Sequence, residues 1–153
     1  MWPLNRLHSF ARLPLEERRL GMRALWILAL VRAGLRLLPF RRLRARIERA
    51  GDARGLADEE YARAVRRAVD RAARTIPGSA CLAQALTAEV LLRRAGRAVR
   101  TSIGVSFEGR PLDAHAWVES AGVLVTGDAE NLGKYRTLLV FGDSAAVSEM
   151  SLR

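Results

Sequence analysis

Cysteine and histidine are scarce in this chain. Its 153 residues include one cysteine, Cys81, and two histidines. One cysteine cannot form a disulfide within the chain, and these three side chains are too few for a closed zinc site built from four Cys and His ligands. We therefore expect a protein that folds without a disulfide or a structural zinc ion.

Long hydrophobic runs are missing as well. The uninterrupted apolar run 24–31 lies between Arg23 and Arg32, and its eight residues are far fewer than the roughly 20 needed to cross a bilayer. The N-terminus carries arginines and a pair of glutamates before this run, and no small-residue cleavage site follows it, which argues against a secretory signal. We predict a cytoplasmic protein with no stable membrane insertion.

Positive charge is abundant but unevenly placed. The chain has 26 lysine and arginine residues against 16 aspartate and glutamate residues, which gives a net charge of +10. Residues 1–80 hold 18 basic and 8 acidic side chains, whereas residues 81–153 hold 8 of each. Because half of the residues are hydrophobic, the chain can bury a core, and its two halves differ in charge.

The first half has the apolar spacing of amphipathic helices. A proline suits the first turn of a helix, carboxylates suit its positive end, and glycine or proline ends it. Four helices are expected: from Pro14 to Pro39, over 41–50, from Asp58 to the break 76–78, and from an N-cap at Ser79 to Gly96.

The second half changes to the two-residue alternation of strands. Residues 99–107 alternate between apolar and polar side chains, and three further short runs are rich in β-branched and aromatic residues. These runs cover 114–120, 123–126 and 136–141. Helices followed by a meander of about four strands predict an α+β fold, in which residues 1–74 form a basic helical segment packed on a core of residues 75–153.

Cys81 falls in the first turn of the last expected helix. A thiol there lies near free backbone N–H groups and the positive end of the helix dipole, which favour the nucleophilic thiolate. The same N–H groups can stabilise the oxyanion that forms on an attacked carbonyl. A lone cysteine beside Ala and Leu residues is also typical of a packed core, so its position alone leaves both interpretations open.

His115 lies in a run whose side chains alternate between two faces of a strand. The small apolar residues around it take the core face, whereas His115 and Trp117 take the other. If Ala121 and Gly122 form a two-residue turn, Asp128 is the residue opposite His115, where its carboxylate can orient the imidazole. A bulged three-residue loop would shift this pairing by one.

Other side chains are candidates for roles at the same site. Asp113 and Asn131 are alternative groups for orienting the imidazole. Gln84, one turn after the cysteine, could donate to an oxyanion or only line its helix. Trp117 could help to form a substrate subsite or pack in the core.

The sequence resembles the leader peptidases of lasso-peptide biosynthesis, which belong to the transglutaminase-like branch of the papain-like fold. The resemblance rests on Cys-Leu-Ala-Gln-Ala-Leu at 81–86, Leu-Leu-Arg-Arg-Ala-Gly at 91–96, Ile-Gly-Val at 103–105, Ala-His-Ala-Trp-Val-Glu at 114–119 and Gly-Asp at 127–128. It covers residues 75–141, and the first half is similar only in its helical character. It implies a catalytic helix packed on an antiparallel sheet, with Cys81 as nucleophile, His115 as base and Asp128 as orienting carboxylate.

The resemblance also implies a reaction and its partners. The family removes the leader from a ribosomally synthesised lasso-peptide precursor, so that an ATP-dependent macrolactam cyclase can act on the new N-terminus. A small leader-recognition protein commonly presents the precursor, and the helical first half of this chain offers no winged-helix unit in its place. We expect these partners, no metal or organic cofactor, and no nucleic acid.

Two other functions remain open on the residues. An acyltransferase with the same three residues would pass the thioester to an amine instead of water. An arginine-rich protein could instead bind nucleic acid or an anionic membrane, although the aromatic residues here are few and scattered. The charge division suggests a further hypothesis, in which the basic helices, with Arg41, Arg42 and Arg44, dock an acidic surface of the leader or its carrier protein.

Overall fold

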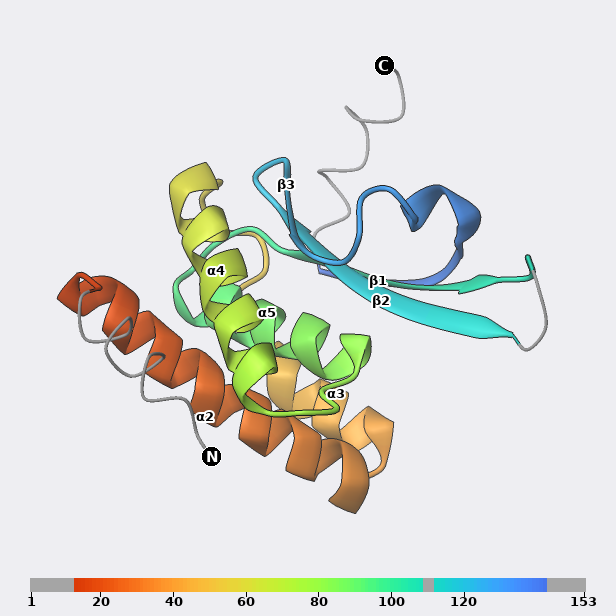
Figure 1. Ribbon diagram of the computed structural model, residues 1–153, viewed down its shortest axis with the longest axis horizontal. Coiled ribbons are helices and arrows are strands. Elements are labelled where there is room, and N and C mark those ends of the chain that lie inside the picture. The colour runs from red at the N-terminus through yellow and green to blue at the C-terminus, as the bar shows by residue number, and fades with distance from the viewer. Residues whose placement is uncertain (1–12, 109–111, 143–153) are drawn as a thin grey trace.

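The computed structural model describes residues 13–108 and 112–142, in which helices come first and strands second (Figure 1). The helices are α2 (Leu15–Leu37), α3 (Phe40–Glu48), α4 (Glu59–Thr75) and α5 (Cys81–Arg94). The strands are β1 (Arg100–Ser106), β2 (Asp113–Ser120), β3 (Val123–Thr126) and β4 (Arg136–Gly142), with a 3-10 turn, η1 (Leu132–Lys134), before the last. The predicted α+β class is confirmed.

Local sequence signals set three of the helix boundaries. Pro14 and Pro39 directly precede α2 and α3, where the missing N–H of proline leaves no helix bond unmade. The Asp58 carboxylate accepts a hydrogen bond from the Tyr61 N–H at 2.9 Å and caps α4. The starts after Pro14 and Asp58 are as predicted, whereas α3 begins one residue before the predicted position 41.

The N-cap expected at Ser79 is wrong. Helix α5 begins at Cys81 after Ala80, and no side chain caps it. The Ser79 hydroxyl lies within hydrogen-bonding distance of the carbonyl oxygens of Ala73 and Ile76, at 3.3 and 3.1 Å. Because the last carbonyls of a helix lack partners inside it, this hydroxyl satisfies the end of α4 and not the start of α5.

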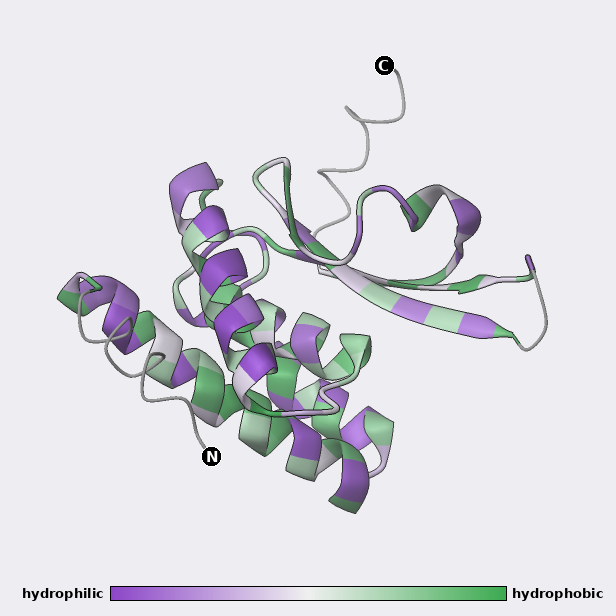
Figure 2. Ribbon diagram, viewed as in Figure 1, coloured by the Kyte–Doolittle hydropathy of each residue, from purple (hydrophilic) through white to green (hydrophobic). Residues whose placement is uncertain are grey.

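One hydrophobic cluster joins the helices to the sheet. Figure 2 shows apolar residues on each helix and along the strands. Fully buried members come from α2, α4, α5 and β2: Leu28, Val65, Val69, Leu86, Leu92 and Val118. Helix α2 therefore packs against α4 and α5, and α5 packs on the sheet. Of the described helices, none combines the length and the apolar character needed to span a membrane.

The sheet is antiparallel with the strand order β3-β2-β1-β4. Strand β4 thus pairs with β1 and not with β3, so the predicted meander is wrong at its last strand. Helix α4 already lies against β3, where Arg66 Nη1 donates to Leu124 O at 3.0 Å. With that side of β3 covered, the chain returns across the sheet and pairs with the free edge of β1.

The β2–β3 hairpin begins as predicted and then changes register. Ala121 and Gly122 both have positive φ, at 50° and 76°, as a tight two-residue hairpin turn requires. Ser120 pairs with Val123 as expected, but a bulge after two pairs shifts the register, and β3 ends at Thr126. The residue predicted opposite His115, at position 128, therefore lies beyond the strand and is not its paired partner.

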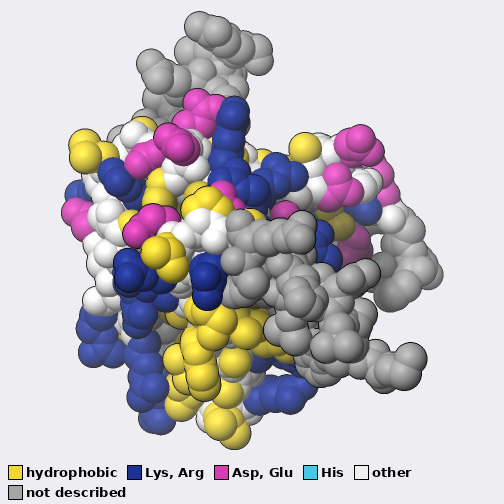
Figure 3. Space-filling model, turned by 60° about the vertical axis from the view of Figure 1, so that its left-hand side comes forward, with side chains coloured by type: hydrophobic (Ala, Val, Ile, Leu, Met, Phe, Trp, Pro, Cys, Tyr) yellow, Lys and Arg dark blue, Asp and Glu magenta, His cyan; other side chains and the backbone are white. Residues whose placement is uncertain are grey.

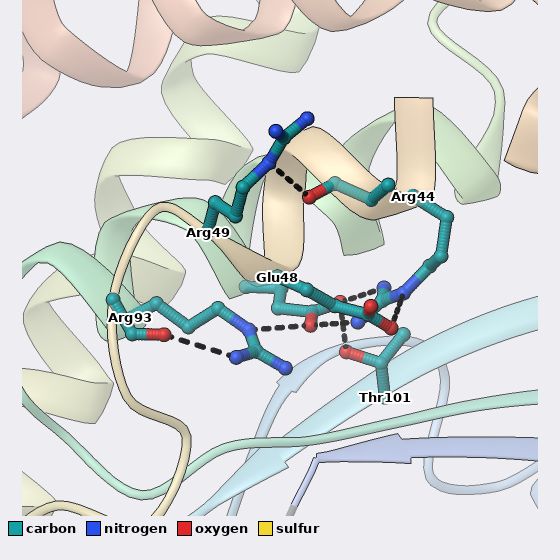
Figure 4. A network of polar contacts seen from close by, with 8 residues as sticks. Arg44, Glu48, Arg49, Arg93 and Thr101 are labelled. Atoms are coloured by element: carbon teal, nitrogen blue, oxygen red, sulfur yellow. Dashed lines mark hydrogen bonds and ion pairs between the residues drawn. The ribbon is translucent and has the colours of Figure 1, made fainter. Parts of the chain in front are cut away.

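A buried polar network joins α3, α5 and β1 (Figure 4). Glu89 of α5 is fully buried, and both of its carboxylate oxygens accept hydrogen bonds from Arg44 of α3. Arg93 Nε and Thr101 Oγ1 donate to the same carboxylate at 2.7 and 2.8 Å. Every oxygen of this buried anion is therefore paired with a cation or a hydroxyl.

This network corrects the docking hypothesis at one position. Arg44 is only 6% exposed and its guanidinium is turned into the protein, so it cannot present charge to a partner. Arg41 and Arg42 are exposed on the same helix. The sequence pattern alone does not distinguish an interior arginine from two solvent-facing ones.

Candidate active site

Cys81 is the first residue of α5, and its free thiol is half-buried. The N-cap residue, Ala80, makes no side-chain hydrogen bond to the helix, and the first helical bond runs from Gln84 N to Ala80 O at 3.2 Å. The N–H groups of the first turn are therefore free of a side-chain cap. Such groups can hold the oxygen of an attacked carbonyl.

Gln84 fixes the segment that leads into the cysteine. Its Nε2 donates to Ser79 O at 2.9 Å, across the start of α5. One of its two amide N–H groups is thus engaged with the chain. The predicted alternative, donation to an oxyanion, would use the other N–H of the same amide.

His115 is half-buried on β2 and forms a cluster with the rings of Trp117 and Tyr135. Its ring stacks on Tyr135 with centroids 5.1 Å apart, and the Trp117 ring lies 6.4 Å away. The His115 Nε2 atom is buried and has no hydrogen-bond partner in the described part of the chain. The imidazole therefore packs against aromatic rings and keeps a buried nitrogen without a partner in the described residues.

The two faces of the sheet contact different parts of the chain. Thr101 bonds to Glu89 of α5, and Ala116 and Val118 belong to the core cluster beneath it. By strand alternation His115 and Trp117 lie on the opposite face, as predicted, and there the chain after β3 supplies Tyr135. Figure 1 shows the helices on one side of the sheet and the segment with η1 on the other.

Trp117 is a packing residue in this structure. It is only 7% exposed, and its ring lies against Gly104, where an added Cβ would come within 3.0 Å of the indole. Gly127 approaches the same side chain, with φ at 115° and an added Cβ only 2.8 Å from the Trp117 Cβ. Two glycines thus let the strands and the following turn close around the ring.

Asp113 has partners that the sequence did not reveal. Tyr135 Oη donates to Asp113 Oδ2 at 2.5 Å, and Lys134 Nζ lies 3.7 Å from the same oxygen. Sequence reasoning missed Tyr135 and Lys134, which lie at the end of η1. Nothing in the local pattern places them against β2, because that contact depends on how the chain crosses the sheet.

Asp128 is held in a turn next to the imidazole. Its two oxygens accept hydrogen bonds from Asn131 Nδ2 at 2.5 Å and from Glu130 N at 3.1 Å. These bonds, the first above all, lower the pKa of the Asp128 carboxyl, and the nearby His115 adds to the effect. Asn131, predicted as an alternative orienting group, here bonds to Asp128.

The described residues contain no hydrogen bond from Cys81 to His115, or from His115 to Asp128. Burial lowers the pKa of His115, while the charges of Asp113 and Asp128 act to raise it. Both carboxylates therefore act on the imidazole through space. The structure gathers His115 and both acidic candidates on one face of the sheet, and it places the cysteine at the start of the helix that packs on the other.

The family model of the transglutaminase-like superfamily matches residues 25–140, most of the chain. The chain belongs to this superfamily. Comparison with curated proteins and with solved structures gave no match. Members of the transglutaminase-like superfamily are generally enzymes with a cysteine triad, either peptidases or acyltransferases. The predicted superfamily is confirmed by this match.

The superfamily match contains every predicted site residue, from Cys81 to Asp128, and begins inside α2. It therefore includes most of the helical half as well as the sheet. Within residues 13–108 and 112–142, no group of three or more His, Cys, Asp or Glu side chains is arranged to hold a metal ion.

Proposed function

We propose that this protein is a cysteine peptidase that removes the leader from a ribosomally synthesised lasso-peptide precursor, with Cys81 as nucleophile, His115 as base and Asp128 as orienting carboxylate. The observation that carries the proposal is the position of the only cysteine of the chain. It opens an uncapped helix inside the region that matches a superfamily of cysteine enzymes. His115 is the only histidine in that region.

The proposed reaction has two stages. Cys81 Sγ attacks the carbonyl carbon of the last leader residue while His115 accepts the thiol proton, and the N–H groups of the first turn of α5 hold the oxyanion. The C–N bond breaks, His115 gives its proton to the amine of the core peptide, and the leader remains as a thioester. Water then attacks the thioester, which releases the leader carboxylate and restores the thiol.

The proposal requires the thiol and the imidazole to meet in the active protein. A short bifunctional alkylating reagent tests this, because it bridges Cys81 and His115 only if they come together. Peptide mass spectrometry of the treated protein should find the two residues linked, and the link should be absent from the His115→Gln variant. Single alkylation of Cys81 with no bridge would reject His115 as its base.

The activity test uses the precursor with its leader-recognition protein, which we propose as a separate partner because residues 15–75 are helical apart from their connections. Cys81→Ala should abolish leader removal and leave the circular dichroism spectrum unchanged. His115→Ala should lose more activity than Asp128→Ala, since the carboxylate only orients the ring. Retained cleavage by Cys81→Ala would refute the proposal, and wild-type activity of Asp128→Ala would give its role to Asp113 or Asn131.

An acyltransferase is the second candidate, and superfamily membership favours it because the superfamily includes enzymes that transfer acyl groups. The thioester on Cys81 would then react with an amine in place of water. Mass spectrometry of the product separates the two, because hydrolysis leaves a free carboxylate on the leader and transfer leaves the acceptor attached to it. The ATP-dependent macrolactam cyclase is the partner we propose downstream of hydrolysis.

A further inference from the structure

Helix α2 is apolar on two faces. Its inner face is buried in the core by Ala24, Ile27, Leu28 and Val31. A helix that packs on the core through one face normally carries polar residues on the opposite face. A helix that is apolar on every face is normally buried on every face. The outer face instead exposes five large apolar side chains, the α2 stripe: Leu15, Met22, Trp26, Leu30 and Leu37.

The exposure of this stripe is large. Trp26 and Leu30 are each 66% exposed and Leu37 is 80% exposed. At 100° per residue all five side chains fall within one arc of the helix, which also contains Arg19, with Arg18 and Arg36 along one border and Arg23 along the other. Figure 3 shows a continuous hydrophobic area with arginine side chains beside it.

A groove lies next to the stripe. It has a volume of about 300 Å³ and runs between α2, α3 and α5. Leu30, Gly34 and Leu43 contribute apolar lining, and Arg46 and Arg94 add positive charge. An apolar surface that continues into a basic groove is suited to an amphipathic helix with acidic borders.

We propose that the α2 stripe and this groove bind an acidic amphipathic helix of a partner protein. The apolar side chains of that helix cover Trp26 and Leu30, and one enters the groove. Its carboxylates lie against the arginines on the borders, which fixes orientation and speeds association. The inference does not rest on Cys81 or on the proposed peptidase activity.

The charges around the α2 stripe favour this occupant over a second copy of the chain. Two α2 stripes facing each other would bring arginine borders together. The carboxylates at the start of α2 are already engaged within the chain, Glu16 with Arg19 and Glu17 with Arg67 and Arg71. Each of them already offsets arginine charge of its own chain, so two facing stripes would keep an excess of positive charge.

Two other occupants fit less well. Residues 1–12 contain two arginines and no carboxylate, so they do not complement the basic borders. A membrane surface could cover the apolar stripe, but it has no side chain to fill the groove beside Leu30. The acidic helix satisfies both features, and the other occupants become outcomes of the test.

The test measures fluorescence anisotropy of a labelled helical peptide of about 18 residues, with leucines at i, i+4 and i+7 and glutamates on both sides of them. The full-length protein should bind this peptide and should bind the same peptide with lysines in place of glutamates at least about tenfold more weakly. Trp26→Ser and Leu30→Ser should each weaken binding about tenfold or more, because each removes a large buried apolar contact.

Matched control variants distinguish binding at the α2 stripe from nonspecific hydrophobic or electrostatic binding. Leu56, 73% exposed and outside α2, is the apolar control, so Leu56→Ser should leave binding unchanged. Arg23→Glu should weaken binding more than Arg54→Glu, although both change the net charge equally. Circular dichroism of each variant should match wild type, because all five substituted positions are on the surface.

Four results would overturn the proposal. The first is no binding of the glutamate peptide, or equal binding of the lysine peptide. The second is sedimentation with phosphatidylglycerol vesicles that depends on Trp26, without peptide binding. The third is a concentration-dependent dimer that Trp26→Ser abolishes, and the fourth is peptide binding that appears only after residues 1–12 are removed.

Discussion

His115 is subject to opposing electrostatic effects. Burial lowers its pKa from the ordinary value of 6.5, whereas the carboxylates of Asp113 and Asp128 act in the opposite direction. Burial prevails, so the imidazole is held in the neutral form to a lower pH than a free histidine. A neutral imidazole is the form that can accept a proton from a thiol, which suits the role proposed for it.

Replacing Asp113 with asparagine should lower the pKa of His115 further. The substitution removes a charge that raises this pKa and keeps an oxygen that can accept the hydrogen bond from Tyr135. A pH titration of the ring protons by NMR measures the change, and the His115→Gln variant assigns the signal, since His8 is the only other histidine.

The lowered pKa of His115 makes the stability of the protein depend on pH. A histidine with a lowered folded pKa is protonated more readily in the unfolded chain, so its contribution to stability is present at high pH and is lost as pH falls below about 6.5.

Glu130→Gln is the charge control for the Asp113→Asn titration, because Glu130 is exposed and is not among the groups that shift the pKa of His115. An unchanged or raised pKa in Asp113→Asn would refute the assignment.

At the scale of elements, Glu89 holds three of them together. It lies on α5 and binds Arg44 of α3 and Thr101 of β1 in the interior. Burial acts to raise the pKa of Glu89, but its hydrogen bonds and charge interactions with Arg44, and its bonds with Arg93 and Thr101, outweigh burial and lower the pKa. The carboxylate therefore remains ionised inside the protein and positions α3 beside the sheet.

Glu89→Gln should destabilise the protein by about 3 to 5 kcal/mol, because it leaves the buried Arg44 without its neutralising charge. Urea unfolding followed by circular dichroism measures this loss. The control is Glu48→Gln, which removes a half-exposed carboxylate from the same arginine and should cost less than about 1 kcal/mol. Equal effects of the two substitutions would contradict the assigned role of Glu89.

At the scale of the whole molecule, the basic helical half and the neutral half share one core. Buried side chains of α2 and α4 pack with those of α5 and the sheet, and the superfamily match begins at residue 25. The net charge of +10 thus lies on a part of the molecule that also contributes to the hydrophobic core. Its exposed arginines are available for partners, whereas Arg44 is structural.

A fragment of residues 75–153 should not fold cooperatively by itself. Without α2 and α4, buried residues of α5 such as Leu86 and Leu92 would face water, and the fragment would lose much of the area that stabilises it. Thermal unfolding followed by circular dichroism should show a broad transition for the fragment and a sharp one for the full chain. A sharp transition of the fragment would show that the sheet half folds independently.

Features that depend on neighbouring residues could be predicted from the sequence. Pro14, Pro39 and Asp58 set helix starts, because proline geometry and a capping carboxylate act within one turn. The turn at Ala121 and Gly122 was predictable for the same reason. The local pattern also predicted a helix that begins near the only cysteine, but the N-cap that it predicted at Ser79 is wrong.

Contacts between distant segments could not be predicted from the sequence, because they arise only when the chain folds. Tyr135 lies on His115 because the chain crosses the sheet after β3 to reach β4, which pairs with β1. The bulge in the hairpin moved Asp128 out of register with His115. The burial of Arg44 against Glu89 likewise joins residues 45 positions apart. Strand alternation and helix capping depend on residues a few positions apart. The pairing of strand edges and the neutralisation of a buried charge depend on segments that come together only in the folded chain.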